Sequence, residues 1–156
     1  MTPAIKALER QGIAHTVHRY EVAEGDDRTY GEAVAAALGA DPATVYKTLV
    51  AQLDTGELVV AIVPVTGTLD LRRLAAAARA KSAEMAKPAV AERATGYVTG
   101  GISPFGQKKR LRTFADASAQ LHEHVYVSAG RRGLQVRVTP SDLVAVTGAT
   151  VTELGR

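Results

Sequence analysis

The chain has 156 residues, a length typical of one domain that buries its own hydrophobic core. It contains no cysteine, which excludes disulfide bonds, a thiolate nucleophile of its own and a thiolate zinc site. The formal net charge is +3, and cations gather at residues 108–112 and 131–132, which permits a phosphate-bearing partner. No segment is apolar over the length of a membrane span, so we expect one cytoplasmic domain, residues 1–156, with no membrane partner.

Capping residues and the period of the apolar residues place the helices and strands. A capping box at Thr29–Glu32 marks one helix start, and Gly39 ends that helix. Up to residue 94 the pattern predicts, in chain order, a helix at 3–11, a strand at 14–20, a loop at 21–28, a helix at 29–38, hairpin strands at 45–53 and 58–64, a helix at 70–80, a short strand at 81–85 and a helix at 87–94.

A glycine-rich loop, residues 100–106, follows, and a basic run comes directly after it. Beyond the loop the pattern predicts strands at 111–114, 121–128 and 134–138 and a last helix at 140–147. Residues 58–63 are apolar on both faces and predict a central strand of a covered sheet. Because helices and strands are interleaved irregularly and include two hairpins, we expect an α+β fold with a mixed sheet and helices packed outside it.

Lys47 is the residue that fits its predicted strand least. Alternation places it with Val45, Leu49 and Ala51, on a side that should face the core. A lysine there either extends its ammonium group to the rim of the core or is held for chemistry or anion binding, and both interpretations stay open. Tyr20, at a strand end, is either a core residue or a hydrogen-bond donor beside such a lysine.

Ser103 invites comparison with the nucleophile elbow Gly-x-Ser-x-Gly, and the comparison fails. Phe105 stands where the second glycine should be, and Pro104 forbids the helix that follows such an elbow. We therefore expect a structural or ligand-contacting role for Ser103 and no covalent one.

Histidines occur as two pairs, His15 with His18 and His122 with His124. The second pair is expected on one face of a strand, where it offers two zinc ligands, but no cysteine or carboxylate completes the set. An ordinary half-exposed pair is the favoured interpretation, and we expect no metal or other cofactor.

Three ordered segments, Tyr46–Val50, Tyr97–Arg110 and Tyr126–Leu134, closely resemble the YbaK/EbsC branch of the YbaK/prolyl-tRNA-synthetase-associated domain family. The similarity extends over essentially the whole chain. It implies a mixed sheet curled into a partly open barrel with helices around it. It also implies a free-standing editing enzyme that hydrolyses the ester between a wrong amino acid and tRNA, typically cysteine on proline tRNA.

Motif matching assigns the expected site residues. The family's essential lysine falls on Lys47, its strand-end tyrosine on Tyr20 and its loop glycine on Gly101, and these form the expected catalytic set. Substrate contacts are expected at Gly100, Ser103, Ser128 and Thr66, and contacts to the tRNA backbone at Lys108, Lys109, Arg110 and Arg131. Some relatives carry an asparagine where residues 65–68 read Val-Thr-Gly-Thr, which leaves the fit around the amino acid open.

An activated aminoacyl ester is easy to hydrolyse, so positioning and electrostatic help suffice and no catalytic triad is required. The resemblance implies that the substrate assists, through the vicinal ribose hydroxyl or the cysteine thiol. The expected partner is the tRNA acceptor end, with prolyl-tRNA synthetase as a further candidate. The alternatives are an Ala-tRNA(Pro) deacylase, a non-catalytic module that binds the acceptor end, and a small-molecule esterase.

Overall fold

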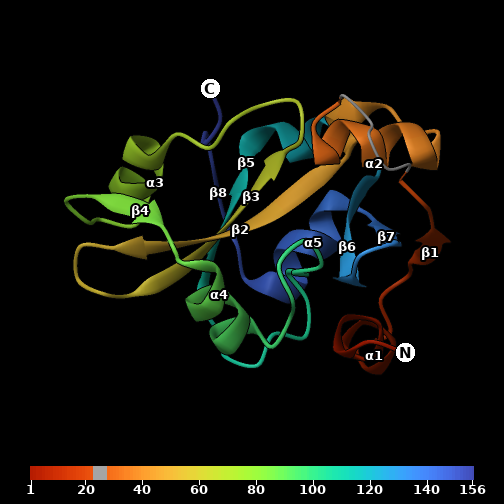
Figure 1. Ribbon diagram of the computed structural model, residues 1–156, viewed down its shortest axis with the longest axis horizontal. Helices are drawn as coiled ribbons and strands as arrows, with labels where there is room; N and C mark the ends of the chain where they lie inside the picture. Colours follow the sequence, from red (N-terminus) through yellow and green to blue (C-terminus); the bar gives the residue numbers. More distant parts are fainter. Residues whose placement is uncertain (23–27) are drawn as a thin grey trace.

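The computed structural model describes residues 1–22 and 28–156, so part of the loop predicted at 21–28 lies outside the described residues (Figure 1). The described helices are α1 (Pro3–Arg10), α2 (Tyr30–Leu38), α3 (Leu71–Ala77), α4 (Pro88–Thr95) and α5 (Pro140–Thr147). The described strands are β1 (Thr16–Arg19), β2 (Tyr46–Leu53), β3 (Leu58–Pro64), β4 (Ala83–Met85), β5 (Arg112–Asp116), β6 (Val125–Arg131), β7 (Leu134–Val138) and β8 (Thr150–Thr152). The α+β class is confirmed.

The strands form two sheets. One has five strands in the order β4-β2-β3-β5-β8, and the other has three in the order β1-β7-β6. The larger sheet is mixed, because β2 pairs antiparallel with β3 and β4 while β5 runs parallel to both β3 and β8. A parallel bridge between Val45 and Tyr126 joins the two sheets. Neither sheet closes on itself, so the predicted partly open barrel is not confirmed.

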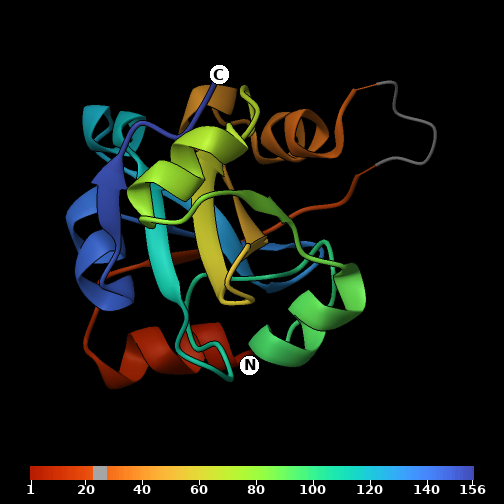
Figure 2. The same ribbon diagram turned by 90° about the vertical axis from the view of Figure 1, so that its left-hand side faces the viewer.

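The larger sheet is covered on both faces. Along β3, Val59, Ala61 and Val63 pack in a cluster with α3, which lies across one face of the sheet (Figure 2). Val60 and Ile62 point the other way, into the main core that α1, α5 and the smaller sheet complete. The prediction of a central, covered strand at residues 58–63 is therefore confirmed.

The C-terminal part differs most from the sequence prediction. Asp116 caps a short 3-10 helix, Ala117–Leu121, so β6 begins at Val125 and the predicted strand at 121–128 starts too early. His122 ends that helix, and the prediction that His122 and His124 share one face of a strand is wrong. Strand β8 was not predicted, because its three residues have partners only in the folded protein.

No helix within residues 1–22 and 28–156 has both the length and the apolar character that crossing a bilayer demands.

Asp116 fastens the C-terminal segment to β5. Its buried carboxylate accepts hydrogen bonds from the backbone N–H groups of Leu154 (2.8 Å), Gly155 (3.1 Å) and Ser118 (3.1 Å), and from the Ser118 hydroxyl. Burial alone raises the pKa of Asp116, but these hydrogen bonds outweigh burial, and the net effect is a lowered pKa. The ionised carboxylate therefore stabilises the folded state.

We expect Asp116→Asn to lower the free energy of unfolding at pH 7 by about 2 kcal/mol, because the amide cannot accept all of these hydrogen bonds. A lowered folded pKa contributes stability above the unfolded value of about 3.9, and this contribution is lost as the pH falls through the folded value. Urea unfolding at neutral and acidic pH measures both effects. The control Glu84→Gln changes an exposed carboxylate of β4, and a loss as large as that of Asp116→Asn would contradict the assignment.

Candidate functional site

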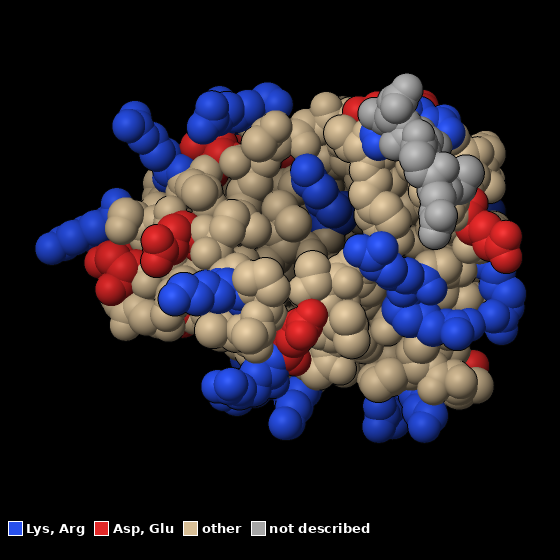
Figure 3. Space-filling view, viewed as in Figure 1, with Lys and Arg blue, Asp and Glu red and all other residues tan. Residues whose placement is uncertain are grey.

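A pocket of about 670 Å³ lies beside the first half of β2. Its other walls come from the start of α2, the loop after β3, the start of α4, the turn at residues 98–101 (the glycine turn) and the β6–β7 hairpin. Figure 3 shows a hollowed, largely uncharged region near the middle of this face, with Lys and Arg side chains around it. Segments far apart in the sequence therefore meet around one cavity.

Lys47 lines this pocket and is half-buried. Its neighbours along the same side of β2, Leu49 and Ala51, pack with the α3 layer, while Lys47 lies nearer the start of the strand. Among the described residues no carboxylate forms an ion pair with its ammonium group. The lysine that breaks the apolar alternation of β2 therefore lies at the cavity, with no acidic partner in the described part of the chain.

The glycine turn, residues 98–101, forms the wall beside α4. The Gly101 N–H donates to the Val98 carbonyl at 2.8 Å, and Gly100 has φ +91°, as the third residue of a type II turn requires. The Glu92 carboxylate accepts from the Thr99 N–H at 2.8 Å and so ties the turn to α4. Gly100 lines the pocket directly.

Gly101 packs against the β6–β7 hairpin. A methyl group on its α-carbon would lie 2.6 Å from the Arg131 Cα and 3.0 Å from the Arg132 nitrogen, both of them backbone atoms. Gly101 is not among the residues that line the pocket. Close packing against the hairpin therefore explains why this position needs a glycine. Contact between the Gly101 backbone and a substrate stays a prediction.

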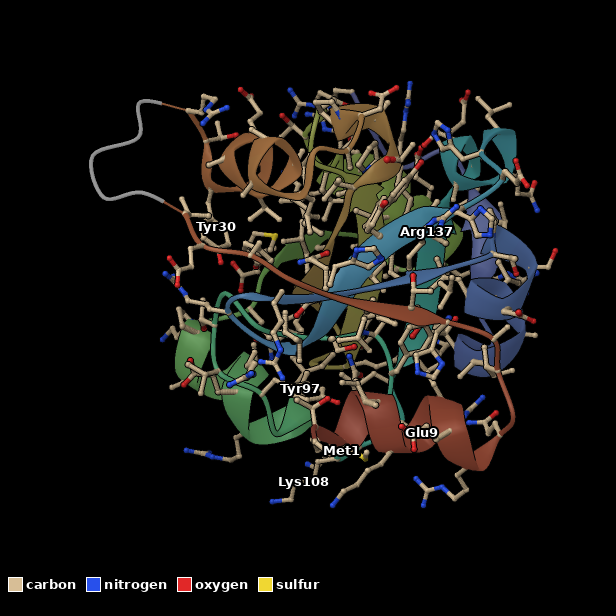
Figure 4. The ribbon with its side chains drawn as sticks, turned by 90° about the vertical axis from the view of Figure 1, so that its right-hand side faces the viewer. Met1, Glu9, Tyr30, Tyr97, Lys108 and Arg137 are labelled. Carbon is tan, nitrogen blue, oxygen red and sulfur yellow. The ribbon has the colours of Figure 1, made fainter. Side chains whose placement is uncertain are left out.

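Tyr20 is connected to the pocket by a hydrogen bond to a second tyrosine. Its hydroxyl lies 3.3 Å from the hydroxyl of Tyr30, which lines the pocket at the start of α2 (Figure 4). Burial and the hydrogen bond to Tyr20 raise the pKa of Tyr30 to about 12, so this phenol stays a proton donor at neutral pH. The Arg132 guanidinium lies 4.9 Å from the Tyr30 ring centre and also contacts Gly100. Tyr30 and Arg132 were not predicted, although both lie inside recognised sequence signals, the capping box and the hairpin.

Ser128, on β6, and Thr66, in the loop after β3, both line the pocket, and their contact with a substrate stays a prediction. The Ser128 hydroxyl accepts from the Gly130 N–H at 3.2 Å. Ser103 is fully buried inside the loop, where its hydroxyl accepts from the Phe105 N–H. It does not line the pocket, so the structure places its hydroxyl in loop folding and does not bring it to the predicted substrate contacts.

The predicted tRNA-binding cations lie outside the pocket. Lys109 and Arg110 border a second cavity of about 220 Å³, together with Arg10 of α1. Lys108 is exposed and lies near the N-terminus, well away from Tyr30 (Figure 4). Arg131 is exposed at the hairpin. The structure thus brings together Lys47, Gly100, Thr66 and Ser128, with Tyr20 one hydrogen bond away, and separates them from the basic run.

The described residues contain no group of three or more histidines or carboxylates that could hold a metal ion.

We expect Gly101→Ala to lower the free energy of unfolding by about 2 kcal/mol, because the added methyl forces the glycine turn away from the hairpin backbone. Thermal unfolding measures this loss. Gly155→Ala is the matched control, because a methyl there meets its nearest neighbour at an ordinary 3.8 Å. Equal stability of the two variants would show that the turn does not depend on this close approach.

Comparisons with known proteins agree on one family. The model of the aminoacyl-tRNA editing domain matches residues 25–146. A relative from Enterococcus faecalis (strain ATCC 700802 / V583), named "Putative Cys-tRNA(Pro)/Cys-tRNA(Cys) deacylase EbsC", is 35% identical over 153 residues, which cover 98% of this chain and 92% of the relative.

Solved structures share the fold. One, described as "a putative trans-editing enzyme for prolyl tRNA synthetase", has 26% identity and a TM-score of 0.86, with 99% of this chain and 95% of the other covered. Another, from work on epitope grafting onto scaffold proteins by computational design, has 24% identity and a TM-score of 0.87 over the same shares of the two chains. The second likeness concerns the fold alone.

Proposed function

The chain belongs to the aminoacyl-tRNA editing domain family, and from this we propose that it is a trans-editing deacylase that hydrolyses mischarged tRNA, with Cys-tRNA(Pro) as its main substrate. Cys-tRNA(Cys) is the second substrate that the relative's name suggests. The observation that carries the proposal is the pocket, which is lined by Lys47, by the glycine turn and by Ser128. No carboxylate of the described residues pairs with the Lys47 ammonium group. Such a site suits a small polar ester at the end of a nucleic acid.

In this proposal Lys47 and Gly101 act on the ester, and Tyr20 positions Tyr30. The Lys47 ammonium group donates to the carbonyl or phosphate oxygens of the acceptor end and stabilises negative charge that develops during hydrolysis. Backbone groups at Gly101 orient the reacting atoms, and Tyr20 supports the donor Tyr30 through their hydrogen bond. Gly100, Thr66 and Ser128 contact the bound aminoacyl end.

No side chain needs to act as nucleophile. The acyl carbon–oxygen bond breaks, the 3′-oxygen of the ribose takes a proton, and water supplies the new oxygen of the free amino acid. Either the vicinal ribose hydroxyl positions that water, or the cysteine thiol first displaces the ribose oxygen and water then opens the thioester. The enzyme contributes position and electrostatic stabilisation.

The exposed cations bind the tRNA body. They are Lys108, Lys109, Arg110 and Arg131, which lie outside the pocket, where they can meet backbone phosphates, and salt weakens such contacts.

The whole of residues 1–156 acts as one editing domain. We also propose a cytoplasmic location, and prolyl-tRNA synthetase as a partner that presents the mischarged tRNA. For the two sheets together we propose the form of a partly open barrel.

A deacylation panel tests the function. We expect the wild-type protein to release cysteine from tRNA(Pro) faster than alanine from the same tRNA, and to leave simple esters without tRNA almost untouched. The panel is run with and without prolyl-tRNA synthetase. Faster release of alanine, or turnover of simple esters alone, would contradict the proposed substrate.

Lys47→Ala tests the site within the same panel. We expect turnover to fall at least about 100-fold, because the donor that stabilises the developing charge is lost, while tRNA affinity falls much less. Lys6→Ala, an exposed lysine of α1, is the control and should keep full turnover. Unchanged turnover in Lys47→Ala would reject the role of the lysine.

A further inference from the structure

Two residues that line the pocket carry a side-chain oxygen without a hydrogen-bond partner in the described part of the chain. Within residues 1–22 and 28–156, the buried Oε1 of Gln135 and the buried Oγ1 of Thr48 meet no donor. Both residues line the pocket that holds Lys47, one from β7 and the other from β2. A buried polar atom without a partner destabilises the fold, and folded proteins contain few of them.

The fold itself does not explain an amide at position 135. Strand β7 is the middle strand of the smaller sheet, and Gln135 is paired across it with Ser128 and His18. Its neighbours along the strand, Leu134 and Val136, point to the other face and belong to the apolar core, while Gln135 itself is only 7% exposed. Burial of this amide with no partner for its oxygen among the described residues needs an explanation.

The residues that line the pocket offer both donors and acceptors. Lys47 offers N–H donors, which suit ester carbonyl or phosphate oxygens. Gln135 and Thr48 contribute two oxygens that have no partner among the described residues. The amide oxygen of Gln135 only accepts, and the hydroxyl of Thr48 can accept as well as donate, so both can receive a hydrogen bond from a ligand group that donates. Both oxygens are shielded from solvent in the empty protein, so a ligand reaches them after a side-chain rotation. Rotation about the last side-chain torsion of glutamine is soft and can turn its oxygen toward the cavity without moving the strand.

We propose that Gln135 and Thr48 form the subsite for the α-amino group of the bound aminoacyl ester, an inference that rests on the proposed function. The α-amino group is the part of every aminoacyl ester that offers more than one strong N–H donor, and two acceptors match it. The subsite distinguishes an amino acid from an acyl group without nitrogen. It leaves the side chain of the amino acid to the other walls of the pocket.

Paired substrates test the subsite. One is cysteinyl-tRNA(Pro), and the other is the same tRNA esterified with 3-mercaptopropionate, which keeps the thiol and lacks the α-amino group. We expect Gln135→Met and Thr48→Val each to lower kcat/KM for the cysteinyl ester about tenfold to 100-fold, and to change that for the mercaptopropionyl ester less than about twofold. Gln120→Met, at an exposed glutamine, should change neither.

Thermal unfolding of the empty protein gives a second, independent result. Because each variant replaces an unpaired buried oxygen by an apolar group of similar shape, we expect Tm to stay level or to rise by about 2–4 °C. A lowered Tm in both variants, or equal losses of kcat/KM on both esters, would overturn the subsite. Failure of the wild-type protein to hydrolyse either ester would instead overturn the proposed function, and the subsite with it.

Discussion

The candidate site depends on the direct contact between the glycine turn and the β6–β7 hairpin. Gly101 has no side chain to separate its backbone from that of Arg131 and Arg132. The contact brings the turn beside the hairpin that carries Ser128 and lets the Arg132 guanidinium reach the ring of Tyr30. Three segments that are distant in the sequence thereby close one side of the pocket. Any larger residue at position 101 is expected to push the turn away from the hairpin, because its β-carbon would overlap the hairpin backbone.

The residues that line the pocket include both hydrogen-bond donors and acceptors. Lys47 provides a cation without an acidic partner among the described residues, and the phenol of Tyr30 remains protonated at neutral pH. Gln135 and Thr48, whose buried side-chain oxygens have no partner among the described residues, line the same cavity. An aminoacyl ester carries both acceptors and a donor, so a pocket with both kinds of partner can hold it in one orientation. Orientation is what an intrinsically reactive ester needs most.

Local rules predicted the elements well and the site in part. Helix ends were found from caps such as Thr29 and Gly39, because a cap acts within one turn of the chain. Lys47 stood out because it breaks the alternation of its strand. The prediction that His122 and His124 lie in a strand was wrong, because Asp116 caps a 3-10 helix that ends at His122. The Asp116 carboxylate also accepts a hydrogen bond from the C-terminal segment. Hydrogen bonds to residues this distant in the chain cannot be predicted from the residues around Asp116.

The sequence by itself determined the class of fold, most element boundaries and an unusual lysine, since these follow from the spacing of apolar residues and from capping chemistry. The tertiary structure alone decided which residues share the cavity. It placed Tyr30, Arg132 and Gln135 beside the predicted residues and turned Ser103 into the loop. The reason is physical: a pocket forms where segments from different parts of the chain fail to fill the space between them, and that depends on packing in three dimensions.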